Sequence, residues 1–223
     1  MIAGFRILPM PSRPSREVVA ALAEMVAAHL SDNMSRLQGA AAAIRPMHAG
    51  VRLAGPALTV RVPAGDNLMV HKAIDIAAPG DVIVVDAAGL LEQAIIGDIM
   101  TSLAAKRGIA GFVIDGAIRD AAELAARPFP VYARGVTHRG PYKNGPGEIN
   151  VPVSIGGMVV RPGDIIVGDG DGVVAVPQAD AEAVLAAARE QKKKEDASLA
   201  AIAAGTIDRK WVDETLRAKG CQV

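Results

Sequence analysis

The stretch GDIMTSLAAKRGIAGFVIDGAIRDAAELAAR, residues 97–127, places a helical pattern, a buried strand and a second helical pattern one after another. The strand GFVIDG at 111–116 does not alternate between apolar and polar residues, which is typical of a strand covered on both faces. Helical patterns over 97–108 and 119–127 flank it. Strands that alternate with helices indicate an α/β fold with parallel pairing.

The same alternation extends to both sides of this stretch. Apolar runs predict strands at 57–62, 81–86 and 131–136, and a helical pattern covers 65–77. The segment 141–177 differs, because it is rich in Gly and Pro and carries only short apolar runs. Such runs indicate short antiparallel or barrel-like strands packed on the same core.

The N-terminal part is predicted to be helical after an irregular or extended arm at residues 1–14. Apolar residues at helical spacing predict a helix over 16–30, with Ser15 as its cap. A second, shorter helical pattern follows over 31–42.

The C-terminal part is also predicted to be helical. A long Ala-rich helix covers 178–204, and a final helix covers about 208–219, closed by Gly220. We therefore expect one α/β domain over 1–177, which includes the N-terminal helices, and a C-terminal helical extension over 178–223.

Composition limits the classes of function. The chain has 223 residues, enough for one large domain at about 150 residues per domain. Aromatic residues make up only 3% of the chain, too few for stacking platforms on single-stranded nucleic acid. The 24 basic residues balance the 24 acidic ones, so no charge excess favours nucleic-acid binding.

Cysteine usage and hydropathy indicate a protein of the reducing cytoplasm. The single cysteine, Cys221, excludes an internal disulfide and a cysteine-based metal site. No apolar run approaches the roughly 18 residues of a membrane span. The N-terminus carries Arg6 and several prolines where a signal peptide needs an apolar stretch. We expect neither a targeting segment nor a membrane partner.

The first candidate site is the junction at Gly97. A glycine directly before a helix leaves backbone N–H groups and the positive end of the helix dipole free to bind a small carboxylate. The alternative is purely structural, with a tight turn at Gly97 and Asp98 as the helix cap. Both interpretations stay open at this point.

The second candidate site is the pair Arg119 and Asp120, which follows a buried strand and opens a helix. Ligands collect at such carboxyl ends of strands in open α/β sheets. Arg119 can hold a carboxylate through two parallel hydrogen bonds. Asp120 offers the hard oxygen ligands that Mg²⁺ and Mn²⁺ prefer. The alternative is a solvated ion pair that caps the helix.

Spacing and longer stretches carry a resemblance to a known family. Twenty residues separate Asp98 from Arg119, Asp120 follows directly, and Glu123 lies three residues beyond. Together with VIDGAIRD, GPALTVRVPAGDN, APGDVIVVDAAG, GPGEINVPVSIGG and RPGDIIVGDGDGVVAVP, this arrangement resembles the RraA-like family over about residues 15–180. The family includes class II 4-hydroxy-4-methyl-2-oxoglutarate aldolases and oxaloacetate decarboxylases. The resemblance implies the swivelling β/β/α fold of phosphohistidine domains, within the α/β class.

The resemblance also implies how the substrate is bound. Backbone amides at the helix start would hold its pyruvyl part, and these amides belong to Gly97, Asp98, Ile99 and Met100. Arg119 would hold the pyruvate carboxylate and offset the charge of the enolate.

A divalent metal cofactor, Mg²⁺ or Mn²⁺, is implied as well, with Asp120 coordinating it partly through waters. Asp98 would lie near these waters and assist proton transfer. Glu123 would be the acid that decarboxylating members carry. A further acid would enter from the C-terminal helix of a neighbouring subunit in a homotrimer or dimer of trimers, and Glu195 is the candidate.

The expected function is a metal-dependent lyase that cleaves a C–C bond of a 2-oxo acid and releases pyruvate. One enolate would serve both retro-aldol cleavage and oxaloacetate decarboxylation. The distal half of the substrate is not specified, although Arg134, Arg139 and Lys143 could meet a distal carboxylate. We interpret His71 as a packed or surface residue of a helix and His138 as a loop residue.

Other interpretations stay open. A Schiff-base aldolase would need a lysine, and Lys72 and Lys106 are the only lysines before residue 143. Some relatives bind and inhibit a ribonuclease, so a non-catalytic regulator is the main alternative. A lyase for another branched or aromatic-derived oxo acid is the third. The run QKKKED, which contains Glu195, also fits a solvated helical face.

Overall fold

The structure, a computed structural model, describes residues 3–223. Its strands are β1 (Phe5–Ile7), β2 (Arg45–Pro46), β3 (Leu53–Arg61), β4 (Val82–Asp86), β5 (Ala94–Ile96), β6 (Gly111–Ile118), β7 (Val131–Val136), β8 (Gly147–Ile149), β9 (Val153–Ile155), β10 (Met158–Val160), β11 (Ile165–Gly168) and β12 (Val173–Val176). Its helices are α1 (Arg16–Ala23), α2 (Ala27–Asp32), α3 (Leu68–Ile76), α4 (Asp98–Lys106), α5 (Ala121–Ala125), the 3₁₀ turn η1 (Gln178–Asp180), α6 (Ala181–Ala203) and α7 (Lys210–Ala218).

The centre of the main sheet is parallel, as the alternation of strands and helices predicts. Its order is β1-β8-β3-β4-β6-β7-β2, and the pairs β3–β4, β4–β6 and β6–β7 are all parallel. All eight residues of β6 are buried, which accounts for the continuous apolar run GFVIDG. The α/β class is confirmed.

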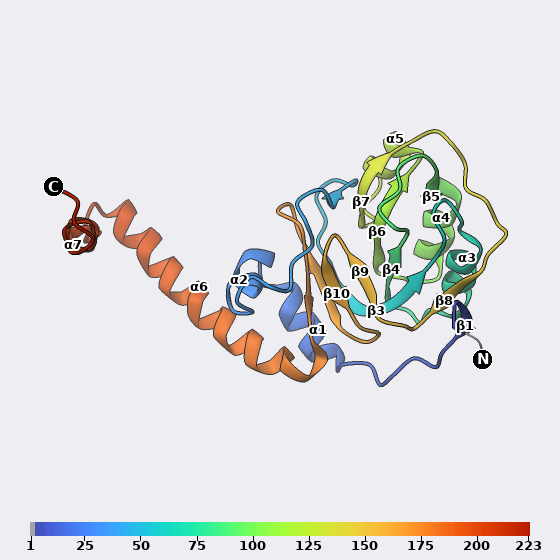
Figure 1. Cartoon of the computed structure of the whole chain (residues 1–223). Helices are drawn as coiled ribbons and strands as arrows, with labels where there is room; N and C mark the ends of the chain where they lie inside the picture. The colour runs from blue at the N-terminus through green and yellow to red at the C-terminus, as the bar shows by residue number, and fades with distance from the viewer. Residues whose placement is uncertain (1–2) are drawn as a thin grey trace.

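The segment after β7 forms short strands, as predicted. The hairpins β9–β10 and β11–β12 are antiparallel, and β11 continues the sheet along β3. Helices α3, α4 and α5 lie on one side of the parallel strands and β9–β10 on the other (Figure 1). Buried apolar side chains accordingly form two clusters, one on each side. A third apolar layer joins α1, α2 and the start of α6 to β11 and β12.

The N-terminal helices depart from the prediction. The helix expected over 16–30 is divided into α1 and α2, because Val26 is extended with ψ 147°. The carboxylate of Asp169, far away in sequence, accepts a hydrogen bond from Ala27 N at 2.8 Å and so stabilises the new helix start. The helical pattern over 31–42 is wrong, since α2 ends at Asp32 and both Ser35 and Arg36 adopt positive φ.

The C-terminal extension forms helices close to the predicted bounds. The first turns of α6 pack on the body through Ala181, Val184, Leu185 and Ala188. Beyond them α6 runs outward, and α7 lies at its far end, away from the sheet (Figure 1). Among residues 3–223, no helix combines the length and the apolar character needed to cross a membrane.

Candidate active site

A cleft of about 210 Å³ opens at the carboxyl ends of β5, β6 and β7. Sites for ligands are common at this edge of parallel α/β sheets. Four segments surround it, namely the start of α3, the junction of β5 and α4, the turn after β6 and the loop after β7. Its lining residues are Asn67, His71, Ile95, Ile96, Gly97, Ile99, Met100, Arg119, Gly140, Pro141 and Lys143.

The start of α4 forms one wall of the cleft. Gly97 is the N-cap, with extended backbone, and the first amides of a helix have no acceptor within it. One of them, Asp98 N, donates a hydrogen bond to Asp120 Oδ2 at 2.9 Å. The amides of Ile99 and Met100 belong to the same turn, beside the cleft. This helix end can accept a small anion.

The turn after β6 forms the neighbouring wall. Arg119 N donates to Ile96 O at 3.0 Å, which fixes the turn to β5. Arg119 Nε lies 3.7 Å from Asp120 Oδ2. Asp120 has a left-handed backbone with φ 57°, and its side chain makes no cap bond to α5. Asp120 thus stands at the N-cap position of α5 and forms the exposed pair with Arg119, but its carboxylate bonds across to α4 instead of capping α5.

The absence of a side chain at Gly97 permits this contact. A Cβ atom placed there would overlap Asp120 Oδ2 and would lie 2.8 Å from Arg119 Cγ. Gly97 thus lets the start of α4 approach the turn after β6 closely.

Asp98 does not cap α4, so the alternative of a tight turn at Gly97 with Asp98 as the helix cap is wrong for Asp98. It is the first residue of the helix, and its carboxylate faces Arg127, with Oδ1 2.7 Å from Nη1. Arg127 also donates to Ser102 Oγ. Neither Asp98 nor Asp120 is among the lining residues of the cleft. The part of Asp98 in proton transfer stays a prediction.

The two glutamates named from the sequence lie apart from the cleft of their own chain. Glu123 is exposed on α5. Glu195 is on α6, where its Oε2 lies 2.5 Å from His29 Nε2. The hydrogen bonds from His29 and then Gln191 lower the pKa of Glu195. Its entry into a neighbouring subunit's site stays a prediction.

Of the basic residues considered for a distal carboxylate, only Lys143 lines the cleft. Arg134 is paired with Asp115, with 2.6 Å between Nε and Oδ1. Neither Lys72 nor Lys106 lines the cleft. Any Schiff-base chemistry in the cleft would therefore fall to Lys143.

Sequence reasoning missed Asn67, and it placed His71 on a helix without connecting it to the site. Asn67 is 1% exposed, and its Nδ2 donates to Ile95 O at 2.8 Å. Within residues 3–223, its Oδ1 and the Nε2 of His71 are buried without a hydrogen-bond partner. Their spacing of four residues, which places both on one helix face, was the available signal. Both line the cleft, and His71 is half-buried on α3, the helix predicted to carry it.

The pKa of His71 offers a test of where Lys143 and Asp75 lie relative to His71. Burial and then the Lys143 ammonium lower it from 6.5, while Asp75 raises it. Lys143→Met should raise the pKa of His71, whereas Asp75→Asn should lower it further, as measured by NMR titration of the imidazole. If the pKa of His71 fell or stayed constant in Lys143→Met, Lys143 would not lie near His71 as the structure has it. Because the unfolded chain binds this proton more readily, the free energy of unfolding should decrease as pH falls below 6.5.

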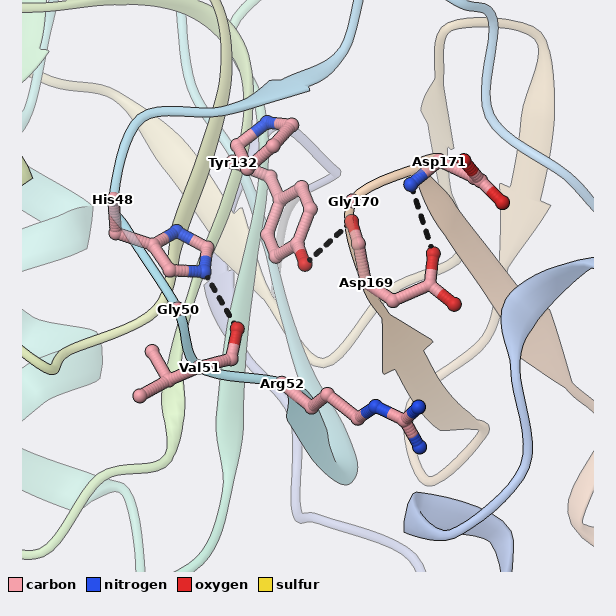
Figure 2. A pocket seen from close by; sticks show the side chains of 9 residues that line it. His48, Gly50, Val51, Arg52, Tyr132, Asp169, Gly170 and Asp171 are labelled. Carbon is pink, nitrogen blue, oxygen red and sulfur yellow. Dashed lines mark hydrogen bonds between the residues drawn. The ribbon is translucent and has the colours of Figure 1, made fainter.

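A larger cavity of about 400 Å³ lies at the opposite edge of the sheet, near the start of β3 and β7 (Figure 2). Three hydrogen bonds pair polar atoms of its lining residues with one another. His48 Nε2 bonds to Val51 O at 3.0 Å, Tyr132 Oη donates to Asp169 O at 3.0 Å, and Asp171 N donates to Asp169 Oδ1 at 3.0 Å. Internal pairing favours a structural role here, in contrast to the free polar atoms of the cleft.

Comparison with known proteins identifies the family of this chain. The family model described as RraA-like, Aldolase/RraA, matches residues 27–175. The chain belongs to the RraA-like family. The matched part contains every residue that lines the cleft.

Similar proteins of the RraA-like family carry different descriptions. A protein of Halalkalibacterium halodurans, named "Putative 4-hydroxy-4-methyl-2-oxoglutarate aldolase", is 46% identical over 78% of this chain and 82% of its own. The solved structure of an uncharacterized protein from Pseudomonas syringae is 31% identical, covers 88% of this chain and 97% of its own, and has a TM-score of 0.79. The RNA-processing inhibitor RraA from Thermus thermophilis is 32% identical over 69% of this chain and 93% of its own, with a TM-score of 0.64. The swivelling β/β/α name stays a prediction within the confirmed α/β class.

The residues beside the cleft suit Mg²⁺ or Mn²⁺ better than Zn²⁺. The Asp120 side chain is 37% exposed beside the cleft and presents hard carboxylate oxygens. In the part of the chain that the structure describes, no three His, Cys, Asp or Glu side chains come together to hold a metal ion. This donor set suits Mg²⁺ or Mn²⁺ retaining several waters, and it does not suit a zinc site with three protein ligands.

Proposed function

We propose that this RraA-like chain is a divalent-metal-dependent lyase that cleaves a C–C bond of a 2-oxo acid and releases pyruvate. The proposed substrates are 4-hydroxy-4-methyl-2-oxoglutarate and related acids, and oxaloacetate. The observation that carries the proposal is that the start of α4 and Arg119 line one cleft, with the Asp120 carboxylate beside them, 2.9 Å from Asp98 N and 3.7 Å from Arg119 Nε.

Binding of the 2-oxo acid follows from the charge of these groups. The amides of Ile99 and Met100 would donate to the substrate carboxylate at the positive end of α4. Arg119, with its planar set of donors, would hold the same carboxylate or the neighbouring oxo group. The apolar side chains of Ile95 and Ile96 would exclude water from one side of the bound molecule.

In the retro-aldol direction, the C4 hydroxyl loses its proton and the C3–C4 bond breaks. The electron pair of that bond moves to C3 and forms the enolate of pyruvate, which then gains a proton. In oxaloacetate the leaving fragment is CO₂, and no hydroxyl proton needs removal. Arg119 would stabilise the negative charge that develops on the enolate oxygen in both reactions. A water oriented by Asp98, or by a carboxylate of a neighbouring subunit, would take the hydroxyl proton.

Asp120 is the residue that would hold Mg²⁺ or Mn²⁺. When bound, such a cation supplies Lewis-acid polarisation of the 2-oxo group. The hydrogen bond from Asp98 N would keep one carboxylate oxygen of Asp120 in place and leave the other available.

The proposal includes assembly into a homotrimer or a dimer of trimers. Beyond its first turns α6 projects from the body (Figure 1). Leu199 and Ile202 on α6 and Trp211 on α7 are exposed. A neighbouring subunit would cover these apolar side chains. Glu195 would then have to leave His29 to reach a neighbour's cleft.

The test is pyruvate release from 4-hydroxy-4-methyl-2-oxoglutarate and from oxaloacetate, each with Mg²⁺, with Mn²⁺ and with a chelator. We expect enzyme-dependent release that chelation abolishes and either metal restores, after subtraction of the metal-only decarboxylation of oxaloacetate. Release that survives chelation would contradict the metal mechanism, and borohydride trapping of pyruvate on Lys143 would then identify Schiff-base chemistry. No release from either acid would contradict the lyase proposal for these substrates.

A second candidate function rests on the likeness to the RNA-processing inhibitor RraA. A regulator that binds a ribonuclease needs a protein surface and no metal. Inhibition of a ribonuclease that is unchanged by a chelator, in a chain that releases no pyruvate, would favour this function.

A further inference from the structure

The carboxylate of Asp66 is buried next to the cleft without lining it. Asp66 is 3% exposed, and three backbone amides share its two oxygens. Leu68 N donates to Oδ1 at 2.9 Å, Asn144 N donates to Oδ2 at 2.6 Å, and Gly145 N donates to the same oxygen at 3.0 Å. Hydrogen bonds to an ionised carboxylate are stronger than those between neutral groups.

These bonds connect two segments that are far apart in sequence. Two backbone bonds run beside them, from Tyr142 N to Gly65 O at 2.8 Å and from Asn67 N to Tyr142 O at 3.0 Å. The first segment leads into α3, and the second is the irregular loop between β7 and β8. Loops lacking regular pairing have few other bonds to hold them in place.

Each connected segment supplies a wall of the cleft. Asn67 lies directly after Asp66, and Lys143 lies directly before Asn144. The carboxylate that holds Asn144 and Gly145 therefore also fixes the backbone of Lys143. Lys143 is the lysine among the lining residues of the cleft, and its ammonium group could meet an anionic substrate there.

We propose that Asp66 is a positioning residue of the active site, which holds the 142–145 segment so that Lys143 faces the bound 2-oxo acid. The inference rests on the proposed lyase function for its kinetic consequence, but the structural part can be tested without turnover. Asp66 itself does not touch the substrate.

The first readout is amide hydrogen exchange in the resting full-length protein. In Asp66→Ala the amides of Asn144 and Gly145 should exchange at least about tenfold faster, because their acceptor is gone. Asp66→Asn keeps one carbonyl oxygen and should show an intermediate rate. The matched control is Asp164→Ala, which removes another buried carboxylate, one that accepts from Arg161 N at 2.8 Å far from the cleft. It should leave the exchange of Asn144 and Gly145 unchanged.

The second readout is the division of the effect between KM and kcat. Asp66→Ala should raise KM for the cleaved oxo acid about tenfold and change kcat less than about threefold, since the lost group orients a binding residue. Lys143→Met should raise KM as well. Adding Asp66→Ala to Lys143→Met should raise KM less than about twofold further, because Asp66 acts through Lys143.

The outcomes separate the two proposals. Unchanged exchange at Asn144 and Gly145 would overturn the inference about Asp66, as would an unchanged KM or multiplicative effects of the two substitutions in an active enzyme. No pyruvate release by the unmodified protein would instead overturn the lyase proposal. In that case the exchange rates would still decide whether Asp66 holds the segment.

Discussion

Asp120→Ala should reduce kcat/KM for pyruvate release by about 10³-fold or more, a loss comparable to removing a main electrostatic group from an active site. The substitution removes the carboxylate that would hold the metal, and it also removes the acceptor of Asp98 N. Both losses fall beside the cleft, and the start of α4 loses its side-chain link to the turn after β6. Initial rates with saturating Mg²⁺ would measure the effect.

Two further variants separate the two causes. Asp120→Asn retains an oxygen that can accept from Asp98 N but lacks the negative charge. If the charge holds the metal, Asp120→Asn should lose at least about 10²-fold in kcat/KM, with a Tm close to that of the unmodified protein. Asp171→Ala is the control, because this exposed aspartate lies at the opposite edge of the sheet, and it should change kcat/KM less than twofold. Full activity in Asp120→Asn would rule out a required charge at this position.

The main part of the cleft was predictable because it depends on local sequence. Arg119 and Asp120 directly follow a buried strand, and Gly97 directly precedes a helix, so each position is fixed by its own neighbours in the chain. Parallel strands then bring their carboxyl ends to one edge. The length and apolar character of β6 made that edge recognisable in the sequence.

The remaining part of the site depends on contacts between distant segments. Asn67 and Lys143 meet at the cleft because Asp66 binds the backbone of the 142–145 segment, and no periodic pattern encodes such a contact. The division between α1 and α2 has a similar origin, since Asp169 supplies the acceptor for Ala27 N. The strands β1, β2 and β5 have two or three residues each, too few for periodicity to reveal them.

Gly97→Ala should lower kcat/KM by about 10²-fold, because a displacement of about 1 Å among positioned groups can have an effect of this size. The backbone at Gly97 has φ −153° and ψ −161°, an extended conformation that alanine also adopts. The effect should therefore come from the added Cβ alone. That atom would overlap Asp120 Oδ2 and lie 2.8 Å from Arg119 Cγ and 3.1 Å from Arg119 Nε.

Either the hydrogen bond between Asp98 N and Asp120 must break, or Arg119 must turn away, and each movement disrupts the proposed anion and metal site. The change in kcat/KM would be measured together with Tm, because overpacking costs about 1–3 kcal/mol of stability. Gly39→Ala is the matched control, since a Cβ there would have its nearest neighbours at 4.0 Å, and its kcat/KM should stay within twofold. If Gly97→Ala kept more than a third of the activity, the close approach of α4 to the Arg119–Asp120 turn would not be needed for catalysis. A large loss of activity with a small change in Tm would instead show that Gly97 is needed for the arrangement of the groups at the cleft and not for stability.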